Sequence, residues 1–260
     1  MLKFAANLSF LYQELPFLDR FAAAAKDGFK GVEYVSPYEW KAHDLKRRLD
    51  DNSLTQVLFN AFPGDWQSGE RGIVSLPERK TEFRDTLDMA FDYAAALDCE
   101  RLHIMAGLER KDLSFINQRH AYVENLAYAA EKCAAENITA LIEPINGKDM
   151  PGYFLSSIAM AEEILAEISH PHLKLQFDIY HVQRTDGDII LQYKRAAPHV
   201  GHIQIANPPH RFEPDNGEIN YPYIFKMLEG EKYDGWVGCE YKPSGVTSET
   251  LGWAHDYLNP

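Results

Sequence analysis

Four side chains that can offer oxygen ligands recur at the spacing of a repeating strand–helix unit. They are Glu143 in TALIEPIN, Asp178 in LKLQFDIYH, Gln204 in VGHIQIAN and Glu240 in WVGCEYKP, with gaps of 35, 26 and 36 residues. Carboxylates at the ends of apolar strands are costly to bury, and several together raise one another's pKa. A divalent cation resolves that conflict, and an all-oxygen ligand set favours Mg²⁺ or Mn²⁺ over Zn²⁺. The alternative is that each acid serves a local salt bridge or loop, but the regular spacing favours a shared site.

The elements that must position these side chains alternate along the chain. The expected strands, short apolar runs rich in β-branched residues, are 3–8, 31–35, 54–60, 101–105, 139–143, 173–178, 200–205 and 236–240. The expected helices are 15–27, 41–51, 78–97, 114–136, 156–168, 187–195, 221–229 and 248–257. Strands that alternate with helices indicate an α/β fold with a parallel sheet.

Eight such units in 260 residues take about 32 residues each, and no Gly-rich dinucleotide fingerprint is present. Both features favour a closed (β/α)8 barrel, with residues 1–260 as one catalytic domain. Side chains at the carboxyl ends of neighbouring barrel strands meet at one mouth. We therefore expect the last four strands to bring the four ligands together. The long loops 61–77 and 206–220, rich in Gly and Pro, should lie at the same mouth.

Composition excludes several classes of function. The formal net charge of −13 leaves no basic footprint for nucleic acid. Three widely spaced cysteines without a CxxC pair argue against disulfides and thiolate zinc, and favour a reducing cytoplasmic compartment. The N-terminal residues lack a signal-peptide pattern, and no run of about 18 apolar residues occurs, so we expect no membrane partner.

Several segments carry a family resemblance. They are KFAANLSFLYQELPF, LFNAFPGDWQSGERGIVSLP, RLHIMAG, LIEPIN, LQFDIYHVQ, HIQIANPPHRFEPDNGEINYP and GWVGCEYKP. Across essentially the whole chain the sequence closely resembles the hydroxypyruvate isomerase family, within the xylose-isomerase-like superfamily of TIM barrels. That resemblance implies a metal-dependent isomerase that uses no organic cofactor.

The resemblance also implies roles for individual residues. The metal ligands it implies are Glu143, Asp178, Gln204 and Glu240. Glu143 and Glu240 would also form the acid–base pair, and His181 and Arg211 would contact substrate oxygens. Related sugar 3-epimerases usually carry His where this chain has Gln204, which favours the isomerase branch.

The implied reaction interconverts hydroxypyruvate and 2-hydroxy-3-oxopropanoate through an enediolate. It needs a base beside a carbonyl and a cation that stabilises charge developing on oxygen. A closely similar branch acts on 2-oxo-tetronate, and the motifs do not separate the two. The sequence leaves open the physiological acid, the choice between Mg²⁺ and Mn²⁺, and whether copies form a homo-oligomer.

An acidic substrate also needs a cation for its carboxylate, and the candidates are Arg211, Lys242 and, more weakly, Arg71. His103 faces either the pocket or the helices, and His202 should lie one layer below Gln204, on the same side of its strand. Pocket-wall candidates are Trp66, Tyr12 and Phe59, whereas Cys239 should pack toward the helices.

Three rival functions share this general site. A sugar or sugar-acid epimerase would use the same metal and paired glutamates. A metal-dependent DNA-repair endonuclease would need several more histidine ligands and a basic surface, which the charge and Gln204 oppose. A catalytically silent sugar-acid binder is disfavoured because Glu143 and Glu240 are both present.

Overall fold

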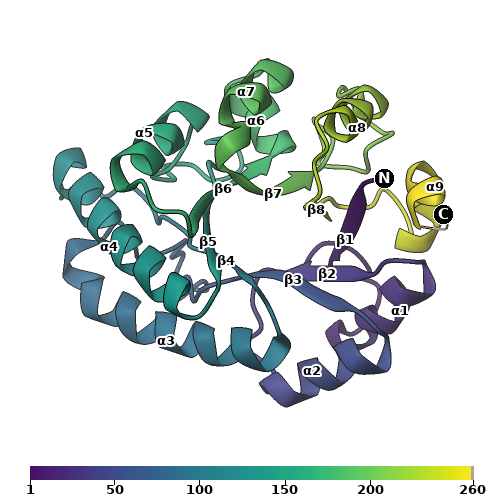
Figure 1. Cartoon of the computed structure of the whole chain (residues 1–260), viewed down its shortest axis with the longest axis horizontal. Coiled ribbons are helices and arrows are strands. Elements are labelled where there is room, and N and C mark those ends of the chain that lie inside the picture. The colour runs from purple at the N-terminus through teal and green to yellow at the C-terminus, as the bar shows by residue number, and fades with distance from the viewer. Residues whose placement is uncertain (259–260) are drawn as a thin grey trace.

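The structure is a computed structural model that describes residues 1–258. Its eight parallel strands follow one another in chain order around a closed barrel (Figure 1). The strands are β1 Lys3–Asn7, β2 Gly31–Tyr34, β3 Thr55–Asn60, β4 Arg101–His103, β5 Thr139–Ile142, β6 Leu173–Asp178, β7 Val200–Ile205 and β8 Trp236–Cys239. The barrel predicted from the alternating pattern is thus confirmed.

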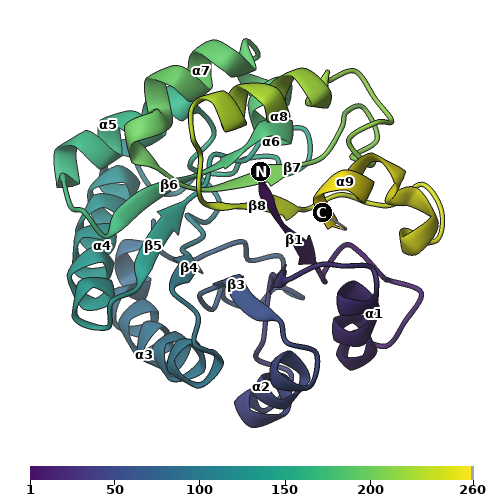
Figure 2. The same ribbon diagram turned by 45° about the vertical axis from the view of Figure 1, so that its right-hand side comes forward.

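Helices surround the barrel on its outside (Figures 1 and 2). They are α1 Arg20–Lys26, α2 Ala42–Asp51, α3 Lys80–Leu97, α4 Phe115–Ala135, α5 Ile158–Ile168, α6 Ile179–Thr185, α7 Ile189–Ala196, α8 Tyr221–Gly230 and α9 His255–Leu258. In Figure 1 the C-terminal α9 lies between α8 and α1, beside β1. The end of the described chain therefore fills the gap in the helical ring where the barrel closes.

The predicted helices nearest the two ends of the chain are divided into shorter elements. The helix expected over 15–27 is a short 3-10 turn, Phe17–Asp19, followed by α1. The helix expected over 248–257 is instead two 3-10 turns, Thr247–Thr250 and Gly252–Ala254, before α9. The hydroxyl of Thr247 accepts a hydrogen bond from the backbone N–H of Tyr12, which ties this segment to the loop after β1. Within the segment, the hydroxyl of Thr250 donates to the carbonyl of Thr247 at 2.9 Å, and local side-chain bonds of this kind compete with a regular helix.

Helix α6 was not predicted, and it begins directly after β6. The Asp178 carboxylate accepts a hydrogen bond from the backbone N–H of Tyr180 at 2.8 Å and so caps the helix. The cap uses Oδ1 of Asp178 and leaves Oδ2 without a hydrogen-bond partner among residues 1–258. A single residue therefore starts a helix and turns its second oxygen to the barrel mouth.

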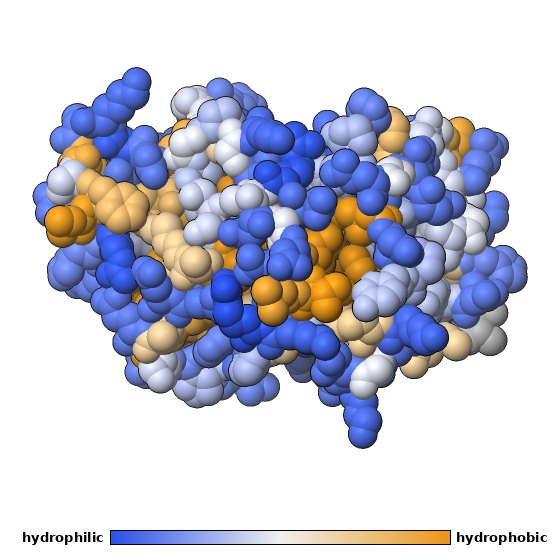
Figure 3. All heavy atoms as spheres, turned by 90° about the horizontal axis from the view of Figure 1, so that it is seen from above, coloured by the Kyte–Doolittle hydropathy of each residue, from blue (hydrophilic) through white to orange (hydrophobic). Residues whose placement is uncertain are grey.

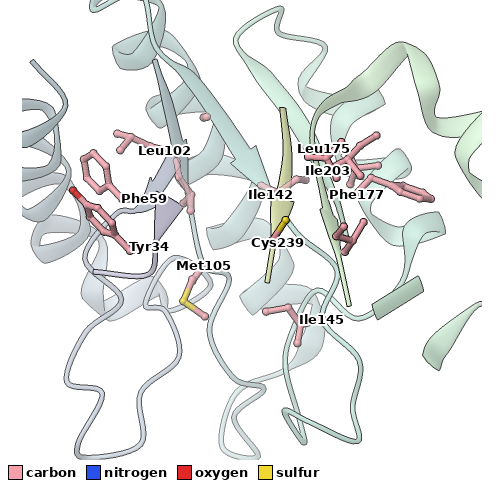
Figure 4. Packing of buried hydrophobic residues seen from close by; sticks show 14 of the residues in the cluster. Tyr34, Phe59, Leu102, Met105, Ile142, Ile145, Leu175, Phe177, Ile203 and Cys239 are labelled. Carbon is pink, nitrogen blue, oxygen red and sulfur yellow. The ribbon is translucent and has the colours of Figure 1, made fainter. Parts of the chain in front are cut away.

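The outward faces of the strands are apolar. Figure 4 shows side chains of this face packed between strands and helices, among them Phe59, Leu102, Ile142, Phe177 and Cys239. Cys239 is fully buried there, which confirms the expected orientation toward the helices. This packing is the main source of stability for the barrel, because it removes large apolar areas from water.

The inward faces are polar at the carboxyl end of the barrel. Asp178 on β6 pairs with Gln204 on β7, and Gln204 pairs with Gly238 on β8. Because side chains alternate along a strand, this register places Asp178 and Gln204 at one level of the interior. Glu240 follows β8 directly.

The side seen in Figure 3 is largely hydrophilic, with hydrophobic side chains gathered near its middle. Among residues 1–258, no helix combines the length and the apolarity that crossing a bilayer would require.

Candidate active site

A pocket of about 190 Å³ opens at the carboxyl ends of the strands. Its polar lining is Asn60, His103, Glu143, Asp149, His181, Arg211 and Glu240. Its apolar lining is Phe10, Val35, Trp66, Met105, Ile145 and Met150. The long loops expected at this mouth both contribute, since Trp66 belongs to the loop after β3 and Arg211 to the loop after β7.

Two acids and a histidine gather at one side of the pocket, where Glu143 and His181 belong to the lining and Asp178 lies outside it. Single ligand atoms of Glu143, Asp178 and His181 lie within 4.8 Å of one another, and all three side chains are buried. Glu143 Oε1 and Asp178 Oδ2 accept no hydrogen bond from any residue in 1–258. Buried acceptors without donors are costly, and a hard divalent cation is the partner that suits two carboxylate oxygens. The two carboxylate oxygens therefore fit the expected metal ion as ligands.

The other side of the pocket holds Glu240 in an ion pair. Arg211 Nη2 contacts Glu240 Oε1 and lies 3.7 Å from Asp178 Oδ2, so one guanidinium stands between the two acids. Glu240 is therefore not part of the three-residue group around Glu143. Arg211 itself has a left-handed backbone with φ of 62°, and its guanidinium lies 4.7 Å from the ring centre of Phe10. A non-glycine residue in this conformation is costly and typical of functional sites.

Gln204 lies at the level of Asp178 and outside the pocket lining. Its Nε2 donates to Glu240 Oε2 and to Glu33 Oε1, both at 2.7 Å, while its Oε1 accepts from Gln176 Nε2 at 2.6 Å. In this arrangement the amide nitrogen, not the oxygen, faces Glu240. The four expected ligands thus converge on one mouth, but Gln204 reaches the acids through hydrogen bonds.

Burial and mutual repulsion raise the pKa values of the three acids. Desolvation first, and then the charges of Glu240 and Asp178, raise the pKa of Glu143 well above its ordinary value. Desolvation raises the pKa of Glu240 to about 8 and that of Asp178 to about 6, although Arg211 opposes both shifts. The site therefore holds protons near neutral pH unless a cation displaces them.

Burial also keeps the two pocket histidines neutral, because it disfavours the charged form of a base as it does that of an acid. Burial, followed by the charges of Arg211 and Arg184, lowers the pKa of His181 well below its ordinary value. Burial and His202 lower the pKa of His103 to about 3. His103 Nδ1 lies 3.6 Å from Glu143 Oε2, so this side chain faces the pocket rather than the helix layer.

A buried acid that the sequence analysis missed supports the site from below. Glu33 on β2 accepts hydrogen bonds from Asn7 Nδ2 at 3.0 Å, from Gln204 Nε2 and from His202 Nε2, the last at 2.7 Å. His202 is fully buried one layer below Gln204, as its strand position predicted. A charged residue within the apolar run GVEYV was the available signal for Glu33.

The remaining candidates lie at different distances from the pocket. The Lys242 side chain is exposed outside the lining, although its backbone N–H donates to the carbonyl of Arg211 at 2.7 Å. Arg71 stacks on Trp66 with its guanidinium carbon 3.8 Å from the ring centre. Of the three aromatic wall candidates only Trp66 lines the pocket, since Tyr12 and Phe59 are buried in the core.

The chain is similar to known proteins in sequence and in fold. A sequence model of the xylose isomerase-like TIM barrel family matches residues 21–257. The 2-oxo-tetronate isomerase of Cupriavidus necator is 52% identical over 258 residues, covering 99% of both chains. The hydroxypyruvate isomerase of Escherichia coli K12 is 44% identical over 257 residues, covering 99% of this chain and all of that one.

A solved structure is also similar over its full length. A crystal structure described as an AP endonuclease, family 2, from Brucella melitensis superimposes with a TM-score of 0.97 at 46% identity, covering 99% of each chain. The full-length relatives in sequence are isomerases, which makes this chain an enzyme of that class. The chain therefore belongs to the xylose isomerase-like TIM barrel family.

Proposed function

We propose that the enzyme is a divalent-metal-dependent isomerase of short 3-hydroxy-2-oxo acids, which interconverts hydroxypyruvate and 2-hydroxy-3-oxopropanoate. The observation that carries this proposal is that two glutamates line the same pocket, namely Glu143 after β5, which is buried, and Glu240 after β8, which is 14% exposed. Full-length relatives named for hydroxypyruvate and for 2-oxo-tetronate support the same class of substrate.

The reaction moves one proton between neighbouring carbons. A base removes a proton from C3 of hydroxypyruvate, and the electron pair forms an enediolate with C2. A second proton leaves the C3 hydroxyl and one is delivered to the oxygen on C2. Return of a proton to C2 then leaves an aldehyde at C3 and a hydroxyl at C2, so no atom or electron is gained or lost overall. Glu143 and Glu240 are our proposed acid–base pair, and general acid–base help of this kind contributes about 10²–10⁴-fold.

We assign the metal to Glu143, Asp178, Gln204 and Glu240. The two unpartnered oxygens, Glu143 Oε1 and Asp178 Oδ2, support an oxygen-seeking cation such as Mg²⁺ or Mn²⁺. A cation held there supplies Lewis-acid stabilisation of the negative charge that develops on substrate oxygen. Gln204 would take part through its Oε1, which now accepts a hydrogen bond from Gln176.

We assign the substrate carboxylate to Arg211. Its side chain lines the pocket and is 14% exposed, whereas Lys242 is exposed outside it. A guanidinium binds a carboxylate through two parallel hydrogen bonds. His181, on the Glu143 side of the pocket, is our proposed donor to a substrate oxygen.

The second candidate substrate is 2-oxo-tetronate, the substrate named for the relative that is 52% identical. It has the same 3-hydroxy-2-oxo group as hydroxypyruvate and one more carbon. The glutamate pair would therefore act on it in the same way, and the pocket wall around Phe10 and Trp66 would decide between them.

A small-molecule substrate in the cytoplasm suits the rest of the chain. Cys99, Cys133 and Cys239 are free, buried thiols, which suits a reducing compartment. The similarity to a structure described as an endonuclease raises nucleic acid as a rival ligand. The net charge of −13 opposes that rival, because phosphate binding depends on basic side chains.

One assay tests the proposal and its alternatives together. Protein stripped of metal with EDTA is incubated with hydroxypyruvate or 2-oxo-tetronate, with Mg²⁺ or Mn²⁺ added back, and the products are followed by NMR in deuterated water. We expect metal-dependent movement of the carbonyl with incorporation of deuterium. Inversion at a stereocentre without carbonyl movement would indicate an epimerase, and cleavage of abasic DNA without isomerisation would reject the proposal.

A further inference from the structure

The amide of Asn146, after β5, is held in one orientation by the backbone. Its side chain is 1% exposed, and its Oδ1 accepts hydrogen bonds from the N–H groups of Lys148 and Asp149 at 3.1 and 3.0 Å. Backbone N–H groups can only donate, so the atom facing them must be the amide oxygen. The opposite, NH₂ end of the amide is therefore fixed as well.

That NH₂ group faces His181 in α6. Asn146 Nδ2 lies 2.6 Å from His181 Nδ1, and the backbone N–H of Asn146 approaches the same nitrogen at 3.5 Å. Both groups are donors, so Nδ1 has to accept and carries no hydrogen. A neutral imidazole has one protonated nitrogen, which leaves the hydrogen on Nε2.

The Nε2 atom of His181 points toward the acids of the pocket. It lies 3.8 Å from Glu143 Oε1 and 3.6 Å from Asp178 Oδ2, and the side chain lines the pocket. A nitrogen that carries a hydrogen has no free electron pair for a metal ion. By its position alone, His181 Nε2 would be a third metal ligand. The hydrogen that it carries makes it a hydrogen-bond donor instead.

We propose that Asn146 is a positioning residue that fixes His181 as an Nε2–H donor to a substrate oxygen and keeps it from binding the metal. The proposal rests on the proposed function, because the oxygen in question is the one that becomes negative in the enediolate. A fixed, uncharged N–H group stabilises such an oxygen without first having to reorganise. The donor role therefore depends on a residue that does not line the pocket itself.

The tautomer can be measured without any substrate. Protein labelled with [¹⁵N]histidine and loaded with Mg²⁺ is examined by NMR, and the His181 ring is assigned by its absence in His181→Ala. We expect Nδ1 to resonate as the bare nitrogen and Nε2 as the protonated one. A bare or metal-bound Nε2 would overturn the proposal.

Two substitutions of Asn146 separate positioning from simple structural support. Asn146→Asp keeps an oxygen for the two backbone N–H groups but presents only an acceptor to His181, so Nδ1 must gain a hydrogen. Asn146→Ala removes the hydrogen bonds to the backbone as well, but it does not force either tautomer on the His181 ring. We expect kcat to fall about 100-fold in Asn146→Asp and only about 10-fold in Asn146→Ala, the range typical of residues behind a ligand.

A structural role predicts the reverse order, so an equal or larger loss in Asn146→Ala would overturn the proposal. Adding Asn146→Asp to His181→Ala should cost little further activity, because the two residues act as a unit. If the unsubstituted protein turns over neither acid, the proposed function fails while the NMR result still decides the tautomer.

Discussion

The two halves of the barrel mouth differ in the chemistry that they offer. The carboxyl ends of β5 to β8 carry Glu143, Asp178, Gln204 and Glu240. Over β1 to β4 the pocket is lined by neutral side chains, namely Phe10, Val35, Asn60, Trp66, His103 and Met105. The second half thus holds the groups able to bind a cation and move protons, and the first half forms the wall against which a substrate would rest.

The halves meet below the pocket, at Glu33 of β2. Asn7 Nδ2 donates to both Glu33 and Glu240 at 3.0 Å, and Gln204 Nε2 donates to the same two acids. A side chain at position 238 would collide with the Glu33 carboxylate, so Gly238 keeps the space that this acid needs. The first half of the barrel therefore orients Gln204 and Glu240. Substitutions in each half can test this division of roles.

The largest effect should come from neutralising the reacting acids of the second half. In Glu143→Gln and Glu240→Gln we expect kcat to fall by about 10³-fold or more, because proton transfer loses its carrier while shape is kept. Steady-state kinetics with saturating Mg²⁺ gives the loss, and circular dichroism checks the fold. Turnover near the normal rate in a folded, metal-loaded double variant would remove both residues from the reaction.

The next effect is a pH dependence of the metal-free protein. Burial raises the pKa of Asp178 to about 6 and that of Glu240 to about 8, so the folded state binds more protons than the unfolded chain above about pH 4. Stability should therefore fall as pH rises toward about 8, by roughly 3 kcal/mol for Asp178 alone at about 1.4 kcal/mol per pKa unit.

Urea unfolding in EDTA between pH 5 and 8 measures this slope. Mg²⁺ should flatten it, because a cation that binds only the folded, deprotonated site adds stability at high pH. An unfolding free energy that increases with pH in EDTA would show that these acids do not carry raised pKa values.

A smaller effect is expected from the supporting acid of the first half. Glu33→Gln places an NH₂ group among the donors of Asn7, His202 and Gln204, and it should weaken metal binding about 10–100-fold, as substitutions behind metal ligands do. Glu213→Gln is the matched control, since Glu213 is also a buried acid but bonds Ser244 and Asn216 outside the pocket lining. Equal losses of affinity in both variants would mean that Glu33 contributes only general stability.

The smallest effect should come from the wall. Trp66→Ala removes apolar contact but no reacting group, so we expect KM to rise about 3- to 10-fold with little change in kcat, equivalent to about 1 kcal/mol of contact. Tyr223→Ala, on the exposed side of α8, is the control. A large fall in kcat with unchanged KM would show that Trp66 takes part in the reaction. The reacting groups would then not be confined to the second half of the barrel.

The sequence was sufficient for the barrel and for the acids at its mouth. Alternating apolar runs locate strands because each strand buries its own side chains, and Glu143, Asp178 and Glu240 stand out because acids rarely end such runs. The break of the tail at Leu251 and the extra helix after Asp178 escaped prediction. Both depend on side-chain bonds to the backbone that a hydrophobic pattern does not record.

Contacts between distant elements were not predictable. Glu33 is far from Gln204 in sequence, and their hydrogen bond exists only because the closed barrel brings β2 opposite β7. The pairing of Asn146 with His181 likewise needs β5 and β6 to be neighbours. Tyr12, considered as a pocket wall, instead donates from its hydroxyl to Asp27 within the helix layer. Each case depends on tertiary geometry rather than on local pattern.

We propose that one divalent cation is held by acids of the second half of the barrel. Titration calorimetry with Mn²⁺ on the metal-stripped protein tests it directly, with Asp178→Asn as the variant, because asparagine can still cap α6 but lacks the charge. We expect one Mn²⁺ per unsubstituted chain and an affinity at least about 100-fold lower in a folded Asp178→Asn protein. Equal Mn²⁺ affinity in the two proteins would contradict the claim.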